Sequence, residues 1–202
     1  MTTYETQRLL FKQLKRDCSD LSVREYEQAV SVLVQRYNTT IHENRFVVGG
    51  AVEFLTYAFL RSAGIECTHR ETEHGLILPD GNKISVNGVF QGGAQNVTLM
   101  NKRGTGERSW LIPRLFVVSG VGIVYGDQYM VKSVYIHDAG DSIELKKSGL
   151  EELISIPDNV LTMNISPKPP TEVADSSLTA GTSVARDILS ETQSQMLLQA
   201  IR

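Results

Sequence analysis

Two glutamates, Glu53 and Glu73, are the residues of this 202-residue chain best suited to metal chemistry. Carboxylate oxygens are preferred ligands of Mg²⁺, and a bound divalent ion can activate a water molecule for attack on a phosphodiester. A nearby lysine, Lys83 or Lys102, would add a positive charge beside the reacting group. A second interpretation of Glu53 stays open, in which it lies on a water-facing helix stripe with Arg61.

Basic residues gather in a glycine-containing segment further along the chain. They are Lys102, Arg103, Arg108 and Arg114, with Trp110 among them. Lysine and arginine side chains neutralise phosphates, and such contacts position a protein on nucleic acid without reading its sequence. This segment therefore predicts contact with a DNA backbone. The alternative is a solvated loop around one core tryptophan.

The cysteines and histidines do not form a recognisable site. Cys18 and Cys67 are far apart and belong to no CxxC motif, which indicates free thiols in a reducing compartment rather than a disulfide framework or zinc site. His69, His74 and His137 are scattered and are expected at the surface or in the core. We therefore expect no metal centre built from these residue types.

Charge and hydropathy narrow the class of protein further. The net charge of −3 argues against a polybasic nucleic-acid coat, although a local basic patch can still steer a ligand. No apolar run reaches the length of a membrane span, and the first residues carry no apolar signal core. These features predict a cytoplasmic protein that has no membrane partner.

Three helices are expected in the first third of the chain, at 5–16, from Ser22 onwards and at about 49–63. Ser22 and Glu25 have the spacing of a capping box. Gly64 is placed to end the third helix in a left-handed conformation. Apolar residues recur at helical spacing through all three segments, and the third segment is the most apolar.

The periodicity changes after Ile65, where strands are expected. Residues 74–90 predict a β-hairpin whose turn is Pro79-Asp80-Gly81-Asn82. Further strands are expected at 95–101, within 115–125, at 131–137 and at 160–165, with a helical turn at 150–154. The chain is long enough to bury one such core.

The organisation predicted from these elements is a single α/β domain with a tail. Residues 1–165 form the domain, and 166–182 are rich in proline, serine and threonine, which predicts a flexible linker. Residues 183–202 predict a short C-terminal helix that is too short to be stable alone. A protein partner, a second copy or the domain itself would have to cover its apolar side.

The helix that opens with Gly50-Ala51-Val52-Glu53, followed by the hairpin, resembles the PD-(D/E)XK nuclease superfamily. The resemblance covers residues from about 47 to 101. It implies a mixed β-sheet of restriction-endonuclease-like type, with one acid from the helix and an aspartate from the first hairpin strand. The next strand of the family carries an acid and a lysine two residues apart, which point to the same face.

This sequence departs from the family at the residues that carry the chemistry. Ser85-Val86-Asn87 fills the acid-x-lysine position, and the aspartate position falls near His74 or Gly75. Serine and asparagine bring no charge to a metal. We therefore predict a degenerate site at Glu53, Glu73, Ser85 and Asn87 with no cofactor. The family order also expects a helix after the third strand, for which 103–113 look too short.

Three functions are compatible with the sequence. The favoured one is a catalytically degenerate nuclease-fold protein, a DNA-binding or scaffolding component of a DNA-processing, restriction or defence system, with homodimerisation as a further expectation. Lys102, Arg103 and Arg108 would then contact the DNA backbone. The second is an active Mg²⁺-dependent DNA endonuclease with a migrated site. The third is an interaction or assembly protein without a nucleic-acid role, which docks through the C-terminal helix.

Overall fold

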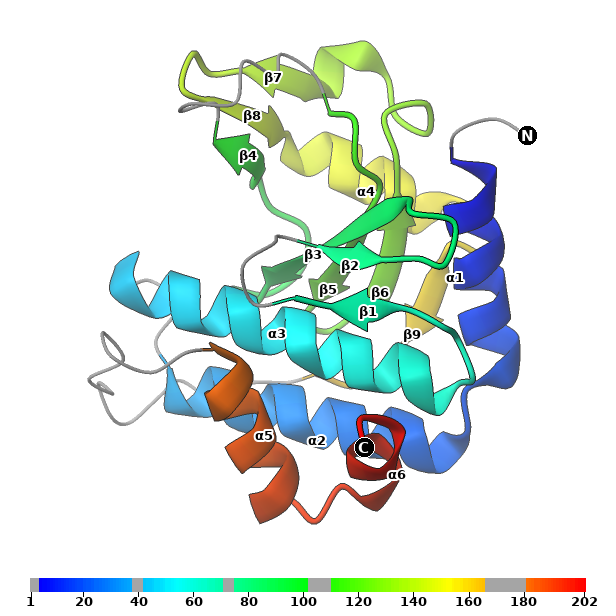
Figure 1. Cartoon of the computed structure of the whole chain (residues 1–202). Coiled ribbons are helices and arrows are strands. Elements are labelled where there is room, and N and C mark those ends of the chain that lie inside the picture. The colour runs from blue at the N-terminus through cyan, green and yellow to red at the C-terminus, as the bar shows by residue number, and fades with distance from the viewer. Residues whose placement is uncertain (1–3, 38–41, 71–74, 102–109, 166–180) are drawn as a thin grey trace.

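The structure, a computed structural model, describes residues 4–37, 42–70, 75–101, 110–165 and 181–202. Its helices are α1 (Glu5–Asp17), α2 (Asp20–Arg36), α3 (His42–Ser62), α4 (Lys147–Ser155), α5 (Gly181–Glu191) and α6 (Gln195–Ala200). The first three precede the strands, and the last two follow them (Figure 1). The predicted class is confirmed: an α/β protein with N-terminal helices, a mixed sheet and C-terminal helical structure.

Six strands form the larger sheet in the order β1-β2-β3-β5-β6-β9. Their bounds are Thr68–His69, Leu76–Ile77, Lys83–Val89, Arg114–Val118, Gly122–Gly126 and Val160–Thr162. Only β3 and β5 pair in parallel, whereas the other neighbouring pairs are antiparallel, so the sheet is mixed. The parallel pair requires a crossover connection rather than a tight turn.

A smaller antiparallel sheet comprises β4 (Val97–Asn101), β8 (Ser142–Leu145) and β7 (Ile136–Asp138), in that order. The short helix η1 (Ser133–Tyr135) leads into β7. Together with α4, this sheet lies on the opposite side of the larger sheet from α2 and α3 (Figure 1). Strand β4 comes from the crossover between β3 and β5, whereas β7 and β8 follow β6, so the small sheet joins two separate segments of the chain.

The larger sheet separates two hydrophobic cores because successive side chains of a strand point to opposite faces. Leu115 and Val117 join the core formed with helices α1, α2, α3, α5 and α6. Phe116 and Val118 join the second core, which the small sheet, α4 and Trp110 complete. All five residues of β5 are buried, as expected for a central strand that is covered on both faces.

The helix boundaries differ from the predicted ones at two N-termini. Helix α2 begins at Asp20 because Ser19 caps it. Oγ of Ser19 accepts a hydrogen bond from the backbone nitrogen of Ser22, and Oγ of Ser22 accepts one from the backbone nitrogen of Ser19. The predicted Ser22–Glu25 capping box is therefore wrong, because a serine rather than a glutamate occupies the third position. Helix α3 begins at His42 instead of about 49. The left-handed end at Gly64 is confirmed by its φ of 73°.

Most predicted strands form, with one clear exception. The hairpin pairs Leu76 with Ile84 around the predicted turn, and the apolar run within 115–125 folds into β5 and β6. The predicted strand at 131–137 is wrong, since η1 occupies its centre and β7 starts only at Ile136. Val134 in that segment is 62% exposed, whereas Val131 is buried in the second core, so the burial does not follow the alternation of a strand.

The domain itself covers the C-terminal helices. The predicted helix at 183–202 is two helices, separated near Gln193, which has a φ of 54°. Their buried apolar residues join the first core: Val184, Ala185, Ile188, Leu189 and Leu197. Glu25 of α2 accepts hydrogen bonds from the backbone nitrogens at the start of α6. Of the predicted linker, 166–180 lies outside the described residues, and 181–182 begin α5.

None of the helices in the described part of the chain combines the length and the hydropathy that a membrane span requires.

Candidate functional site

Helix α3 places Glu53 against the hairpin, where its carboxylate is held by two groups. Oε2 accepts a hydrogen bond of 3.0 Å from the backbone nitrogen of Gly75, and Oε1 lies 3.3 Å from Nε2 of His69. The Glu53 side chain is 13% exposed, so it does not lie on a water-facing helix stripe. His69 in turn packs edge-on against Phe54, which fixes the imidazole beside the carboxylate.

Gly75, at one of the two positions proposed for the family's aspartate, has a backbone conformation that disfavours a side chain. Its φ is 93°, a region that glycine populates readily and other residues rarely adopt. A Cβ added there would lie 3.1 Å from the carbonyl oxygen of Ile84 and 3.7 Å from Cα of Ser85. Gly75 therefore connects the two halves of the site: its nitrogen binds Glu53 and its backbone lies against Ser85.

Strand β3 presents Ser85 and Asn87 on one face, and Arg114 of β5 reaches both of them. Ser85 and Arg114 are partners in the parallel register of β3 and β5. Nη1 of Arg114 donates a hydrogen bond of 3.0 Å to Oγ of Ser85 and one of 2.6 Å to Oδ1 of Asn87. Arg114 is 8% exposed. The two residues predicted at the acid-x-lysine positions thus supply neutral oxygens that bind an internal guanidinium.

This arrangement has a definite electrostatic consequence. A guanidinium stays protonated at every pH a protein experiences, and it donates hydrogen bonds without accepting any. Ser85 and Asn87 supply acceptor oxygens but no negative charge. The site therefore stabilises a cation that belongs to the chain itself, and that cation repels a divalent metal ion at the same position.

The structure brings together four of the predicted site residues and leaves four untested. Glu53, Ser85, Asn87 and Arg114 converge where α3, the hairpin and β5 meet. Glu73, Lys102, Arg103 and Arg108 lie outside the described residues. Arg114 was predicted to contact phosphates, but its guanidinium is buried between two strands. The sequence did not predict that Arg114 binds Ser85 and Asn87, because no pattern of neighbouring residues specifies that β3 pairs with β5.

Trp110 is a core residue in the structure. It is 2% exposed, its indole Nε1 donates to the carbonyl oxygen of Ile112 at 2.7 Å, and its ring packs edge-on against Phe116.

Within the described residues, no group of three or more histidines, cysteines, aspartates or glutamates is arranged to hold a metal ion.

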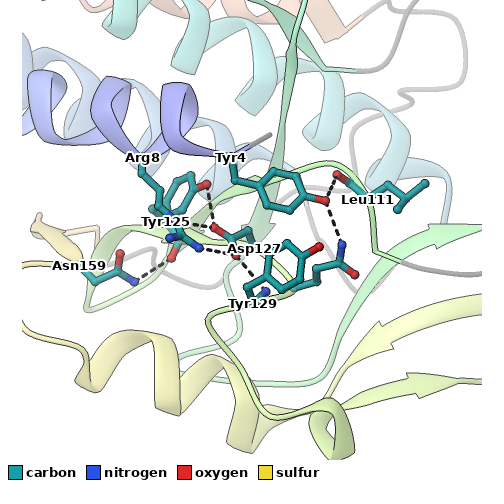
Figure 2. Close-up of polar contacts among 8 residues, drawn as sticks. Tyr4, Arg8, Leu111, Tyr125, Asp127, Tyr129 and Asn159 are labelled. Carbon is teal, nitrogen blue, oxygen red and sulfur yellow. Dashed lines mark hydrogen bonds and ion pairs between the residues drawn. The ribbon is translucent and has the colours of Figure 1, made fainter. Parts of the chain in front are cut away.

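A second polar cluster, shown in Figure 2, joins α1 to the segment after β6. Arg8 binds the carboxylate of Asp127 through two hydrogen bonds, of 2.8 and 2.9 Å, and Asp127 is 1% exposed. The same carboxylate accepts from the hydroxyl of Tyr125 and from the backbone nitrogen of Tyr129. Burial, and then the charge of Asp127, raise the pKa of Tyr125.

The hydrogen bonds of this cluster end on other groups of the protein, which indicates a structural role. Tyr4 donates to the carbonyl oxygen of Leu111 at 2.8 Å and accepts from the amide of Gln128 at 3.0 Å (Figure 2). Asn159 donates to the carbonyl oxygens of Tyr125 and Leu153. Nothing in the spacing of Arg8 and Asp127, 119 residues apart, could have predicted their contact.

Comparison of the chain with protein-family models, with curated proteins and with solved structures gives no match.

Proposed function

We propose that this protein is a catalytically degenerate nuclease-fold protein that acts as a DNA-binding or scaffolding component of a DNA-processing, restriction or defence system. One observation carries the proposal: the Arg114 guanidinium is bound by Ser85 and Asn87, the two residues at the family's acid-x-lysine positions. A charge of the protein itself thus takes the place where an active member of that family assembles its metal site.

The energetics favour loss of the metal over its relocation within this site. Two charges about 4 Å apart interact by about 4 kcal/mol at an effective dielectric constant of about 20, and the interaction doubles for a divalent ion. Here the interaction between Arg114 and a metal ion is repulsive. Glu53, the remaining described acid of the site, is already bound to Gly75 and His69. A single carboxylate in that state offers a divalent ion few of the oxygens it needs.

The arrangement of elements supports the resemblance in part. Helix α3 carries its glutamate onto an antiparallel hairpin, and the second strand of that hairpin pairs with β5. The family order expects a helix in the crossover from β3 to β5. Among the described residues of that crossover, 90–101 and 110–113, there is strand β4 and no helix. This departure concerns the connection rather than the residues of the site.

In this proposal, Lys102, Arg103 and Arg108 contact the DNA backbone. They lie in the crossover between β4 and β5, which leads into Arg114 at the site. Because the chain has a net charge of −3, its attraction to phosphates must come from such a local group of cations. Contacts of this kind give affinity that falls as the salt concentration rises.

A cleavage assay tests the catalytic half of the proposal. Purified protein is incubated with supercoiled plasmid or labelled duplex and with Mg²⁺ or Mn²⁺, beside a Glu53→Ala variant. We expect no metal-dependent cleavage by either protein. Robust cleavage that disappears in Glu53→Ala would overturn the proposal and support an active endonuclease with a migrated site.

A binding assay tests the DNA half. Fluorescence anisotropy with a labelled duplex is recorded over a series of salt concentrations for the wild type and a Lys102→Ala/Arg103→Ala/Arg108→Ala variant. We expect a salt slope that decreases by up to about 0.9 for each cation removed. The matched control removes three exposed cations of α1 and α2, Lys12, Arg16 and Arg24, and should keep the wild-type slope. Absence of binding at low salt would support an assembly protein instead.

A further inference from the structure

A hollow of about 440 Å³ opens beside Asn87, between the first half of α3, strand β3 and strand β4. Its volume lies in the range of small-molecule sites in proteins. The side chains and backbone that matter for its chemistry belong to Gly49, Asn87, Phe90, Gln91, Gln95 and Asn96. The hollow is thus contiguous with the site through Asn87, but most of its lining has no part in that site.

Among the lining residues that the structure describes, none has a charged side chain and four have amide side chains. An amide offers both a donor group and an acceptor group, so several amides together suit a neutral ligand whose edge carries both kinds of atom. A phosphate or carboxylate would lose its hydration there without gaining an opposite charge, which is unfavourable. The ligand that fits this chemistry is a neutral group rich in hydrogen-bonding atoms.

Several of these amide groups have hydrogen-bonding capacity to spare. Oδ1 of Asn96 accepts from the backbone nitrogen of Lys147 at 2.8 Å, which orients the amide and leaves its NH₂ group to donate. In the described part of the chain, the side chains of Gln91 and Gln95 make no hydrogen bond. Asn87 uses its oxygen for Arg114, and its Nδ2 makes only a long contact of 3.3 Å with the carbonyl oxygen of Thr98.

One side of the lining is aromatic. The ring of Phe90 lies against Gly88, so closely that a Cβ at position 88 would clash with it. The glycine therefore makes room for the ring beside β3. Aromatic rings stack on nucleobases because every base has a π-face.

We propose that this hollow binds a nucleobase, with adenine preferred, because asparagine and glutamine pair with adenine through two hydrogen bonds to its N6 and N7 atoms. The base could belong to a free nucleoside or to an unpaired nucleotide of DNA, since proteins can take a single base out of the stack into a pocket. The DNA source rests on the proposed function, whereas binding of a free nucleoside does not.

Position 49 allows a steric test of the proposal. A Cβ added at Gly49 meets no atom of the described residues within 4 Å, and leucine is a good helix former. Gly49→Leu should fill part of the hollow and abolish binding of adenosine measured by calorimetry. Gly49→Ala, the size control, should bind adenosine as the wild type does. Unchanged binding in Gly49→Leu, or no nucleoside binding by the wild type at millimolar concentration, overturns the proposal.

A second pair of variants tests the amides. Gln91→Ala with Gln95→Ala should weaken adenosine binding by about tenfold or more, because each lost hydrogen bond is worth roughly threefold to tenfold. The matched control, Gln28→Ala with Gln199→Ala, removes two exposed glutamines of α2 and α6 and should leave the affinity unchanged. Equal weakening in both double variants, or none in the first, would contradict the assignment of the amides.

Oligonucleotides separate the two sources of the base. Anisotropy is measured with a duplex that carries one unpaired adenine and with the same duplex fully paired, and we expect tighter binding of the first. Adenosine binding without any oligonucleotide binding would support the hollow and overturn the DNA-binding function. Equal binding of both duplexes without adenosine binding would support the DNA-binding function and overturn the nucleobase site in the hollow.

Discussion

Arg114 and Asn87 are joined by a hydrogen bond of 2.6 Å from the guanidinium Nη1 to the amide Oδ1, across the parallel pair of strands β3 and β5. This contact gives Asn87 a structural function at the position that the proposed resemblance assigns to a lysine. It also explains why a neutral residue suits that position, since a lysine there would lie beside a buried guanidinium of the same charge.

Replacement of Asn87 by leucine should therefore destabilise the fold. The guanidinium of Arg114 would lose a charge-assisted hydrogen bond while it stays buried, at a cost of about 1.5–3 kcal/mol in the free energy of unfolding. Urea denaturation followed by circular dichroism measures this change. Asn87→Asp keeps the acceptor and adds an opposite charge, so it should remain close to the wild type. Equal stability of Asn87→Leu and Asn87→Asp would show that the contact contributes little.

Two glycines near the site should respond to alanine in opposite ways. Gly75→Ala should cost about 1–2 kcal/mol of stability, because its φ of 93° is strained for a residue with a Cβ. Gly49→Ala should stabilise the protein by up to about 1 kcal/mol, since alanine favours the helix and meets no neighbour there. Thermal denaturation of both variants tests the pair. A stabilising Gly75→Ala would contradict the conformation described for the aspartate position.

Local patterns predicted most of the elements correctly. Apolar spacing located α1, α2 and α3, and the Pro79–Asn82 turn located the hairpin, since these signals lie within single turns or alternating strands. The short strands β1 and β8 were missed because two to four residues are too few for a periodicity. The segment around Val134 alternates like a strand, yet it folds into η1, which leaves Val134 exposed while its neighbours Tyr135 and Ile136 pack against the second core.

The site was predictable only where its residues are close in sequence. Glu53, Ser85 and Asn87 could be located because an apolar helix and a hairpin contain them, although Glu53 lies in the middle of α3 and not at the helix start that was predicted. The guanidinium that joins Ser85 to Asn87 comes from a strand 27 residues beyond Asn87, and nothing local specifies the parallel register that brings it there. The contacts of Glu53 with Gly75 and His69 likewise depend on how the helix packs on the sheet.

Replacement of Arg8 and replacement of Asp127 should cost different amounts of stability, and the two effects should be coupled. Arg8→Ala leaves the carboxylate of Asp127, which is 1% exposed, without its counter-ion, and we expect a loss of about 3 kcal/mol. Asp127→Asn leaves the arginine with a side chain that is 42% exposed and can turn to water, so the loss should be smaller. A double-mutant cycle by urea denaturation should give a coupling energy above about 1 kcal/mol. Additive effects would contradict a coupled pair.

Cys67 should make the stability of the protein decrease at alkaline pH. Burial raises the pKa of its thiol to about 11, from an ordinary value of 9.0. The raised folded-state pKa contributes stability that is complete below pH 9 and is lost as the pH rises toward 11, because the unfolded chain ionises first. Denaturation midpoints between pH 8 and 11 should therefore fall less steeply in Cys67→Ala than in the wild type. Parallel curves would show that the thiol has no such role.

Glu25 should control whether α6 stays docked. Glu25 is 8% exposed, and its carboxylate accepts hydrogen bonds of 3.2 and 3.0 Å from the backbone nitrogens of Met196 and Leu197. It thus caps a helix whose own N-cap residue, Ser194, makes no side-chain capping hydrogen bond. Loss of such a cap costs about 1–2 kcal/mol, and most of the cost should fall on α6 because the carboxylate contacts that helix end.

Hydrogen–deuterium exchange of a Glu25→Ala variant is the matching measurement. We expect the amides of 195–200 to exchange roughly tenfold faster or more, while those of β5 keep their protection. Glu27→Ala is the matched control, since Glu27 lies on the same helix and accepts from the backbone nitrogen of Asn164 instead. It should leave the exchange of α6 unchanged. Faster exchange of α6 in both variants would mean that α2 as a whole, and not the carboxylate of Glu25, holds the C-terminal helix in place.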